Sequence, residues 1–118
     1  MIKAYKLYTG PDGHSHVVTG RVAENQFDEA LSIRFKETPP QGAYDWHTAP
    51  TTQYVLCLCG TLEFECHSGL KFILRPGEVL IAMDTTGTGH KWNLIDDQPW
   101  KRAYIVFKDE ASINFLAD

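Results

Sequence analysis

Two histidines in separate parts of the chain carry the side chains best suited to chemistry. His90 closes the glycine- and threonine-rich stretch MDTTGTGHKWN at 83–93, and His47 lies in DWHTAP at 45–50. Imidazole titrates near neutral pH and is a common metal ligand, so either residue can serve as an acid, a base or a ligand. Glycines permit positive φ angles, and we expect those before His90 to form turns that aim the imidazole at a site.

The elements that must hold these histidines are predicted to be β-strands. Segments 54–66, 71–83 and 102–107 are rich in Val, Ile, Leu, Phe and Tyr, and turns rich in Gly, Pro and Asp separate such runs along the chain. This pattern predicts an all-β sandwich or barrel. We expect one short helical turn at 25–31 and either a strand or an irregular arm at 109–118.

Composition limits the classes of protein to consider. The chain has 118 residues, of which 43% are hydrophobic and 22% charged, and its formal net charge is -4. Such a chain fits one globular domain over 1–118. It lacks the clustered basic residues of a nucleic-acid-binding protein and an apolar run long enough to span a membrane, and we expect no secretory leader. Three cysteines without a zinc-type spacing predict buried free thiols, and we expect a cytoplasmic protein.

A first motif, within 42–60, resembles the cupin family of small β-barrels. Cupins carry the pattern H-x-H-x3-E-x6-G in this part of the fold. Here the corresponding residues are His47, Ala49, Gln53 and Gly60, with the spacing intact. The second histidine and the glutamate of the pattern are therefore replaced by an alanine and a glutamine.

A second motif, within 75–95, carries the same resemblance. It opens at a Pro-Gly-Glu turn and ends in His90, but Met83 and Thr85 stand where cupins usually have proline and glycine. In detail the DWHTAP and DTTGTGH stretches look like a group of small single-domain cupins of unassigned activity. The resemblance implies a single-domain cupin-type fold over 1–118, a double-stranded β-helix or jelly-roll barrel with a site inside.

The resemblance also implies a possible metal site, because cupins commonly bind a divalent metal through three histidines and a glutamate. In this chain the ligands would be His47, Gln53 and His90, and such a set suits Zn, Fe, Ni or Mn. Ala49 cannot bind a metal, and Asp84 would supply a charge only if its loop folds inward. A metal-free pocket therefore stays open as the alternative.

In a metal-free pocket the two histidines would be the catalytic residues, acting as acid and base on a small polar or anionic molecule. Gln53 would orient that ligand, Trp46 and Trp92 would form aromatic walls, and Arg34 would bind an anionic group. We expect an isomerase, a lyase or an oxygenase-like enzyme. A non-catalytic binding or sensing module is the alternative, and a structural protein with a vestigial pocket is also open.

Two further patterns bear on assembly and on secondary sites. Segment 53–59, QYVLCLC, is apolar on both faces after its glutamine, so a second layer must cover it. We expect a homodimer to supply that layer, and a sandwich in which the protein's own other sheet covers the strand is the alternative. His14 and His16 lie two residues apart in a probable hairpin, where we expect an exposed polar face instead of a zinc site.

Overall fold

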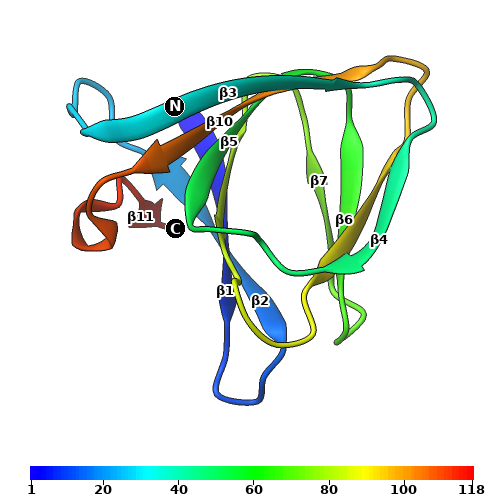
Figure 1. The fold of residues 1–118 in the computed structure, drawn as a ribbon, viewed down its shortest axis with the longest axis horizontal. Coiled ribbons are helices and arrows are strands. Elements are labelled where there is room, and N and C mark those ends of the chain that lie inside the picture. Colours follow the sequence, from blue (N-terminus) through cyan, green and yellow to red (C-terminus); the bar gives the residue numbers. More distant parts are fainter.

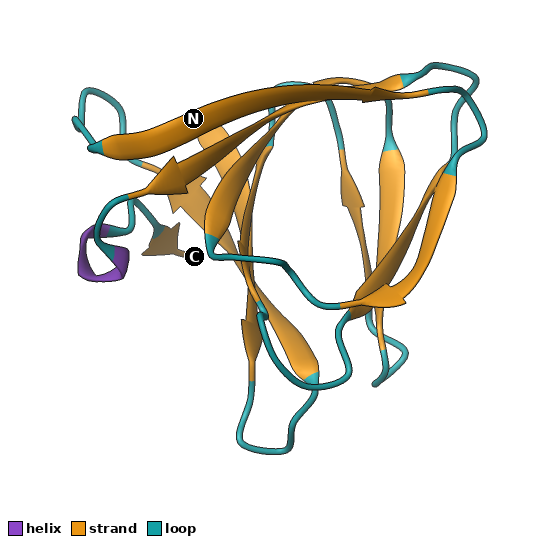
Figure 2. Ribbon diagram, in the orientation of Figure 1, coloured by secondary structure: helices purple, strands orange, loops and turns teal.

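The computed structural model describes residues 1–118, with the exception of the side chain of residue 111. The chain forms strands joined by short loops, and one short 3-10 helix lies near its end (Figures 1 and 2). The elements are β1 (Ile2–Thr9), β2 (Ser15–Val22), β3 (Ala30–Thr38), β4 (Ala43–His47), β5 (Gln53–Cys59), β6 (Leu62–Cys66), β7 (Lys71–Leu74), β8 (Val79–Met83), β9 (His90–Leu94), β10 (Trp100–Phe107), η1 (Glu110–Ser112) and β11 (Leu116–Ala117).

Two sheets face each other across the core. The larger sheet has the strand order β11-β2-β1-β8-β5-β10-β3, and the smaller has the order β4-β9-β6-β7. All neighbouring strands pair antiparallel except β1 and β8, which are parallel. The expected all-β class is confirmed. The two sheets are not joined by hydrogen bonds into one closed barrel, so the expected barrel is an open arrangement of two sheets (Figure 1).

Strand β6 shows why this sequence makes a two-sheet core. Leu62, Phe64 and Cys66 are buried, and the two glutamates between them lie half-buried on the other face, where Lys71 contacts both. Successive side chains of a strand point to opposite faces, so this alternation places every second residue between the sheets. The same arrangement in β7 and β9 completes the wall that faces the larger sheet.

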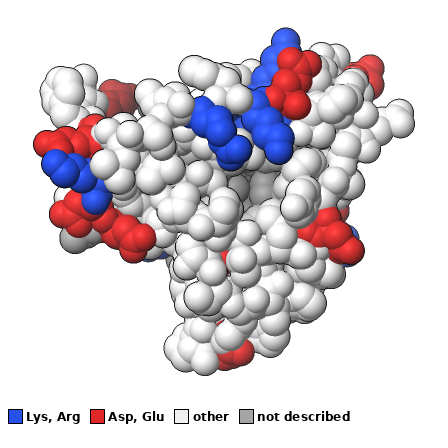
Figure 3. Space-filling model, in the orientation of Figure 1, with Lys and Arg blue, Asp and Glu red and all other residues white. Residues whose placement is uncertain are grey.

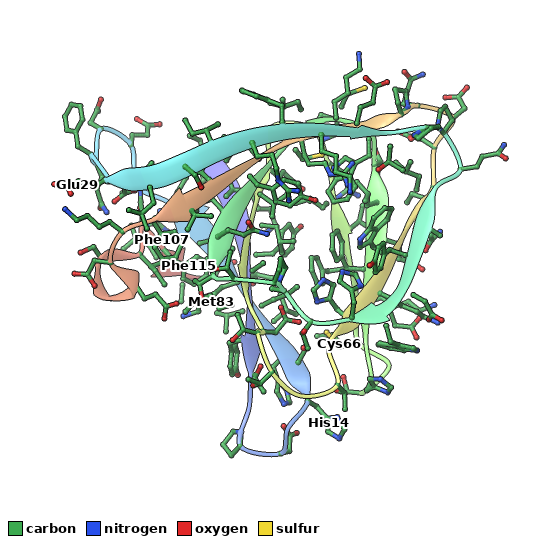
Figure 4. All side chains as sticks on the ribbon, viewed as in Figure 1. His14, Glu29, Cys66, Met83, Phe107 and Phe115 are labelled. Atoms are coloured by element: carbon green, nitrogen blue, oxygen red, sulfur yellow. The ribbon has the colours of Figure 1, made fainter. Side chains whose placement is uncertain are left out.

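A second, smaller cluster lies on the outer face of the larger sheet. Val79 and Ile81 of β8 belong to it, whereas Leu80 of the same strand belongs to the main core. Phe107 and Phe115 cover this outer face, and Figure 4 shows them beside Met83, on the side of the sheet away from the smaller sheet. Strand β8 is buried on both faces, so it needs a layer on each side. The smaller sheet covers one side, and the end of β10 together with the segment that follows it covers the other.

The outer cluster covers only one end of β5. Tyr54 is buried in the outer cluster, but Leu58 near the other end of the strand is 54% exposed. The edge strand β3 adds three exposed apolar side chains, which are Leu31, Ile33 and Phe35. The chain itself therefore covers one end of the outer face and leaves the other end apolar and open, and the homodimer stays a prediction.

The expected helical turn at 25–31 is wrong. Asn25 has a positive φ of 64°, and β3 already begins at Ala30. Phe27 is 99% exposed, so this segment has no apolar side chain packed against the core that would hold a helical turn in place. At 109–118 both alternatives are partly realised, by η1 and the two-residue strand β11. Among the described elements no helix is long and apolar enough to cross a membrane.

Candidate functional site

His90 stands at the start of β9 and is fixed by a buried carboxylate. Its Nδ1 lies 2.6 Å from Oδ2 of Asp84, and the Ser15 hydroxyl donates to the same oxygen over 2.6 Å. Both Asp84 and Ser15 are fully buried. Because a carboxylate oxygen only accepts, Nδ1 of His90 carries the proton and Nε2 is the atom left for a ligand. The loop therefore does fold inward, and Asp84 sits behind the histidine.

His47 ends β4 and is held in the same way by a different acceptor. Its Nδ1 donates to the backbone carbonyl of Asp45 over 2.7 Å, which again leaves Nε2 available. His47 pairs with His90 in the strand register, and the two ring centroids are 4.5 Å apart. Burial is the largest effect on His47 and lowers its pKa; the hydrogen bond to the Asp45 carbonyl opposes this, and the neighbouring His90 and Asp84 have smaller effects that lower and raise the pKa respectively. His47 is therefore a neutral imidazole at neutral pH.

Glycines make this pairing possible, as the sequence predicted. Gly87 and Gly89 have φ angles of 80° and 73°, a region that other residues rarely adopt. A β-carbon added at Gly89 would lie 2.1 Å from the carbonyl oxygen of His47. The turn thus brings β9 so close to the end of β4 that only a glycine fits. The backbone N–H of Ala49 donates to the carbonyl of Asp84 over 3.0 Å and ties the two motif loops together.

Both imidazoles line a cavity of about 160 Å³ between the sheets. Gln53, Trp92 and Arg34 also line it, and no described residue hydrogen-bonds the side-chain amide of Gln53, which is 4% exposed. The other lining residues are Lys36, Tyr44, Ala49, Pro50, Val55, Phe64, Leu80, Ala82, Trp100, Arg102 and Tyr104. The cavity is thus aromatic and apolar over most of its wall, with a few polar groups, which is the usual composition of a small-molecule site.

The structure places Trp46 outside this cavity. Its ring stacks on His67 with centroids 3.7 Å apart, and the Lys91 ammonium lies 5.0 Å from its centroid. The aromatic wall assigned to it is formed instead by Trp100, whose ring packs edge-on against Trp92. The proposed ligand-binding role of Trp46 is therefore not supported by its position.

Sequence reasoning missed Arg102, the most buried cation of the cavity. It is 2% exposed, and its guanidinium carbon lies 3.8 Å from the centroid of the Trp100 ring. In RAYIVF the alternation of Arg102 and Tyr104 with Ala103 and Ile105 was the signal available, because alternate residues share a face. Both polar residues point toward the cavity.

The three remaining histidines lie away from this cavity. Nε2 of His16 contacts both carboxylate oxygens of Asp12 at 3.0 Å, and Nδ1 of His14 lies 2.9 Å from the Thr88 hydroxyl. Both side chains are half-buried, so they are less exposed to solvent than the sequence predicted. The sequence argument also overlooked Asp12 as a nearby carboxylate. Each histidine already has a partner that accounts for its position.

The donor set matches a resident divalent cation poorly. Among the described residues, no group of three or more His, Cys, Asp or Glu side chains is placed to hold a metal ion. The carboxylate that contacts His90 belongs to Asp84; its Oδ2 already receives two hydrogen bonds, and its Oδ1 is buried with no hydrogen-bond partner among the described residues. Arg34, Lys36 and Arg102 line the same cavity and repel a dication. The site therefore resembles a cavity for a small molecule more than a metal centre.

Comparisons with solved structures agree with the fold. The chain is similar to a cupin domain from Bordetella pertussis, with 20% identity, 76% of this chain and 94% of the other covered, and a TM-score of 0.51. It is also similar to a conserved protein with a double-stranded β-helix domain from Klebsiella pneumoniae, with 16% identity, 84% of this chain and 90% of the other covered, and a TM-score of 0.51. A cupin superfamily protein from Desulfitobacterium hafniense is similar as well, with 19% identity, 75% of this chain and 84% of the other covered, and a TM-score of 0.50. No protein-family model and no curated protein sequence matches the chain. The fold is thus of the cupin type, and the resemblance seen in the two motifs is confirmed at that level.

Proposed function

We propose that this cupin-type domain binds a small polar or anionic molecule in the cavity and exchanges protons with it through His47 and His90, without a resident metal. The observation that carries the proposal is the hydrogen bonding of the two rings. Each Nδ1 donates to a group that only accepts, the Asp45 carbonyl or the Asp84 carboxylate, so both Nε2 atoms are free to face a ligand.

Two such nitrogens support an acid–base reaction that moves a proton between atoms of one substrate. His47, a neutral base because burial lowers its pKa, accepts a proton from a C–H or O–H group of the ligand. The same ring then delivers that proton to a second ligand atom and becomes neutral again, and His90 can accept and return a proton through its own Nε2 in the same way. The Asp84 carboxylate fixes the orientation of the His90 ring and offsets a positive charge that the ring takes up. No net electron is transferred: the reaction is an isomerisation when the second atom stays bonded to the substrate, and an elimination when that atom belongs to a leaving group whose bond to carbon breaks as a carbon–carbon double bond forms.

A binding or sensing module is the alternative, because an apolar cavity with a few polar groups suits retention as well as turnover. A module of this kind would bind the same molecule but would not exchange its protons. A metal-dependent enzyme is the other alternative, and it would show a stoichiometric transition metal that depends on His90.

One experiment separates these possibilities. Small 2-oxo acids, hydroxy acids and sugars are screened for thermal stabilisation of the protein, and those that bind are incubated with it in D2O. We expect exchange of ligand C–H for C–D, followed by NMR, that is lost in His47→Gln and in His90→Gln. Binding without exchange in the wild-type protein would favour the sensing module and contradict the proposal.

We also propose a cytoplasmic homodimer. Cys57, Cys59 and Cys66 are free, and burial raises the pKa of Cys57 and Cys66 to about 11, which suits unreactive thiols in a reducing compartment. The support for a dimer is the apolar outer face formed by β3 and the exposed end of β5, where Phe35 is 74% exposed. Apolar patches of this kind commonly mark interfaces.

A further inference from the structure

A buried cation without a counter-charge lies in the cavity wall. Arg102 is 2% exposed, yet no described carboxylate lies within ion-pair distance of it. Its Nε donates to the Tyr104 hydroxyl over 3.0 Å, and its Nη1 donates to the Thr38 hydroxyl over 2.7 Å and to the Trp100 carbonyl over 3.2 Å. These contacts hold the guanidinium in one orientation and supply no negative charge.

The remaining nitrogen of Arg102 is therefore open to a ligand. An arginine side chain has five N–H donors, and the three hydrogen bonds named above leave Nη2 without an acceptor among the described residues. Buried charges in proteins are normally paired, because removing a charge from water without a partner is costly. The guanidinium also lies near the rings of Trp100 and Tyr104, which stabilise a cation without neutralising it, so Nη2 stays available to an anionic partner from outside the chain.

The surroundings indicate the charge of that partner. Arg34 and Lys36 of β3 are exposed and line the same cavity, and none of its described lining residues is an Asp or a Glu. Lys and Arg side chains gather along β3, next to a hollow in this face of the molecule (Figure 3). This local excess of positive charge, in a chain of net charge -4, attracts an anion toward the cavity.

The rest of the wall limits the size and the body of the anion. The cavity of about 160 Å³ is close to the roughly 150 Å³ of an engineered apolar cavity that binds benzene. Phe64, Trp92 and Trp100 give it an aromatic surface that suits a short apolar or single-ring group. A planar carboxylate group fits a fixed guanidinium with charge-assisted hydrogen bonds.

We propose that the ligand of this site is a small monocarboxylic acid, with its carboxylate bound by Nη2 of Arg102 and its apolar body between the two tryptophans. This inference rests on the proposed function, because it names the ligand class of the same cavity. Arg34 and Lys36 at the rim attract the anion, and Arg102 holds it. His47 and His90 line the same cavity and face the remainder of the ligand.

The test compares benzoate with benzamide, which share a ring and differ in charge, and adds inorganic phosphate as an anion without an apolar body. Binding is followed by calorimetry and by the fluorescence of the tryptophans. We expect benzoate to bind about ten-fold or more tighter than benzamide, the ratio that one charged hydrogen bond provides, and to weaken as salt rises. We expect no phosphate binding of comparable strength.

Variants show which residues hold the anion. Arg102→Gln should abolish the preference for benzoate over benzamide. The double variant Arg34→Gln/Lys36→Gln changes two exposed residues and leaves the core intact, so it should lower the affinity for benzoate and leave the affinity for benzamide unchanged. Lys101→Gln removes the same charge from the outer face of the same strand and should change neither affinity.

The inference is overturned if benzamide binds as tightly as benzoate, if phosphate alone binds, if neither acid nor phosphate binds, or if the Arg34→Gln/Lys36→Gln protein binds benzoate like the wild type. Its failure differs from failure of the proposed function. If only neutral ligands bind and exchange protons, the proposed acid–base function stands and the proposed carboxylate ligand is wrong. If carboxylates bind through Arg102 but exchange no protons, the proposed ligand class stands and the proposed acid–base reaction is wrong.

Discussion

Replacing Gly89 by alanine tests how the two histidines are brought together. Gly89 has a φ of 73°, and an added β-carbon would lie 2.1 Å from the carbonyl oxygen and 2.4 Å from the carbonyl carbon of His47. Two separate costs follow. The left-handed backbone costs about 1–2 kcal/mol for a residue with a side chain. Displacing a packed backbone to make room costs a further amount of about 1–3 kcal/mol.

Gly77→Ala is the matched control for this substitution. Gly77 also has a positive φ, of 86°, but a β-carbon there meets no atom within 4 Å. The control therefore includes the backbone cost and leaves out the collision with His47. We expect Gly77→Ala to lower the free energy of unfolding by about 1–2 kcal/mol and Gly89→Ala by about 2–5 kcal/mol.

Urea denaturation measures both free energies, and the imidazole resonances of His47 and His90 in NMR spectra report the geometry. Gly89→Ala should shift both sets of resonances and weaken ligand binding, while Gly77→Ala should leave them in place. Equal losses of stability in the two variants, with unchanged imidazole resonances in Gly89→Ala, would refute the claim that close approach at Gly89 positions the pair.

Four other measurements test separate parts of the account. His47 has a lowered pKa in the folded state, so the unfolded chain takes up its proton first as the pH falls below the ordinary value of 6.5. The free energy of unfolding should therefore decrease from that pH downward, and His47→Gln should reduce this slope in urea titrations at several pH values. Ser15→Ala removes a buried donor to the Asp84 carboxylate and should cost about 1.5–3 kcal/mol in the same assay, whereas a cost near zero would contradict the role given to this bond. Phe35→Glu should convert a dimer into monomers in light scattering without lowering the stability of the monomer, and a wild-type protein that is already monomeric would reject the dimer. Elemental analysis of untagged protein should find no stoichiometric transition metal, and a metal that disappears in His90→Ala would restore the metal-dependent alternative.

The all-β fold was predictable because local signals agree along most of the chain. Alternating apolar residues such as those of β6 predict a strand with one buried face, and turns separate the strands at short intervals. The two motifs added the relation between distant segments, and in the structure His47 and His90 are register partners. Alternation and motif spacing therefore supplied the fold and the histidine pair.

The side chains that face the cavity were harder to predict, because β4 is irregular where it supplies His47 and because a buried charged residue such as Arg102 is uncommon. The register of β4 shifts between Tyr44 and His47, so simple alternation does not tell which side chain of this strand points inward, and Trp46 was placed incorrectly. The irregularity between β10 and β5 lies in β5, where one residue is skipped between Cys57 and Cys59, so β10 itself alternates regularly through Arg102 and its alternation was a usable signal. Bulges reverse or re-aim side chains relative to a regular strand, and a sequence alone does not locate them.

His47 and His90 are both expected to keep Nδ1 protonated and to present Nε2 to a ligand. Long-range proton–nitrogen correlation spectra of ¹⁵N-labelled protein at a slightly alkaline pH identify the tautomer of each ring directly. The account predicts the Nδ1–H tautomer for both histidines and a change at both Nε2 resonances when benzoate saturates the cavity. An Nε2–H tautomer on either ring, or Nε2 resonances that do not respond to a ligand bound in the cavity, would contradict it.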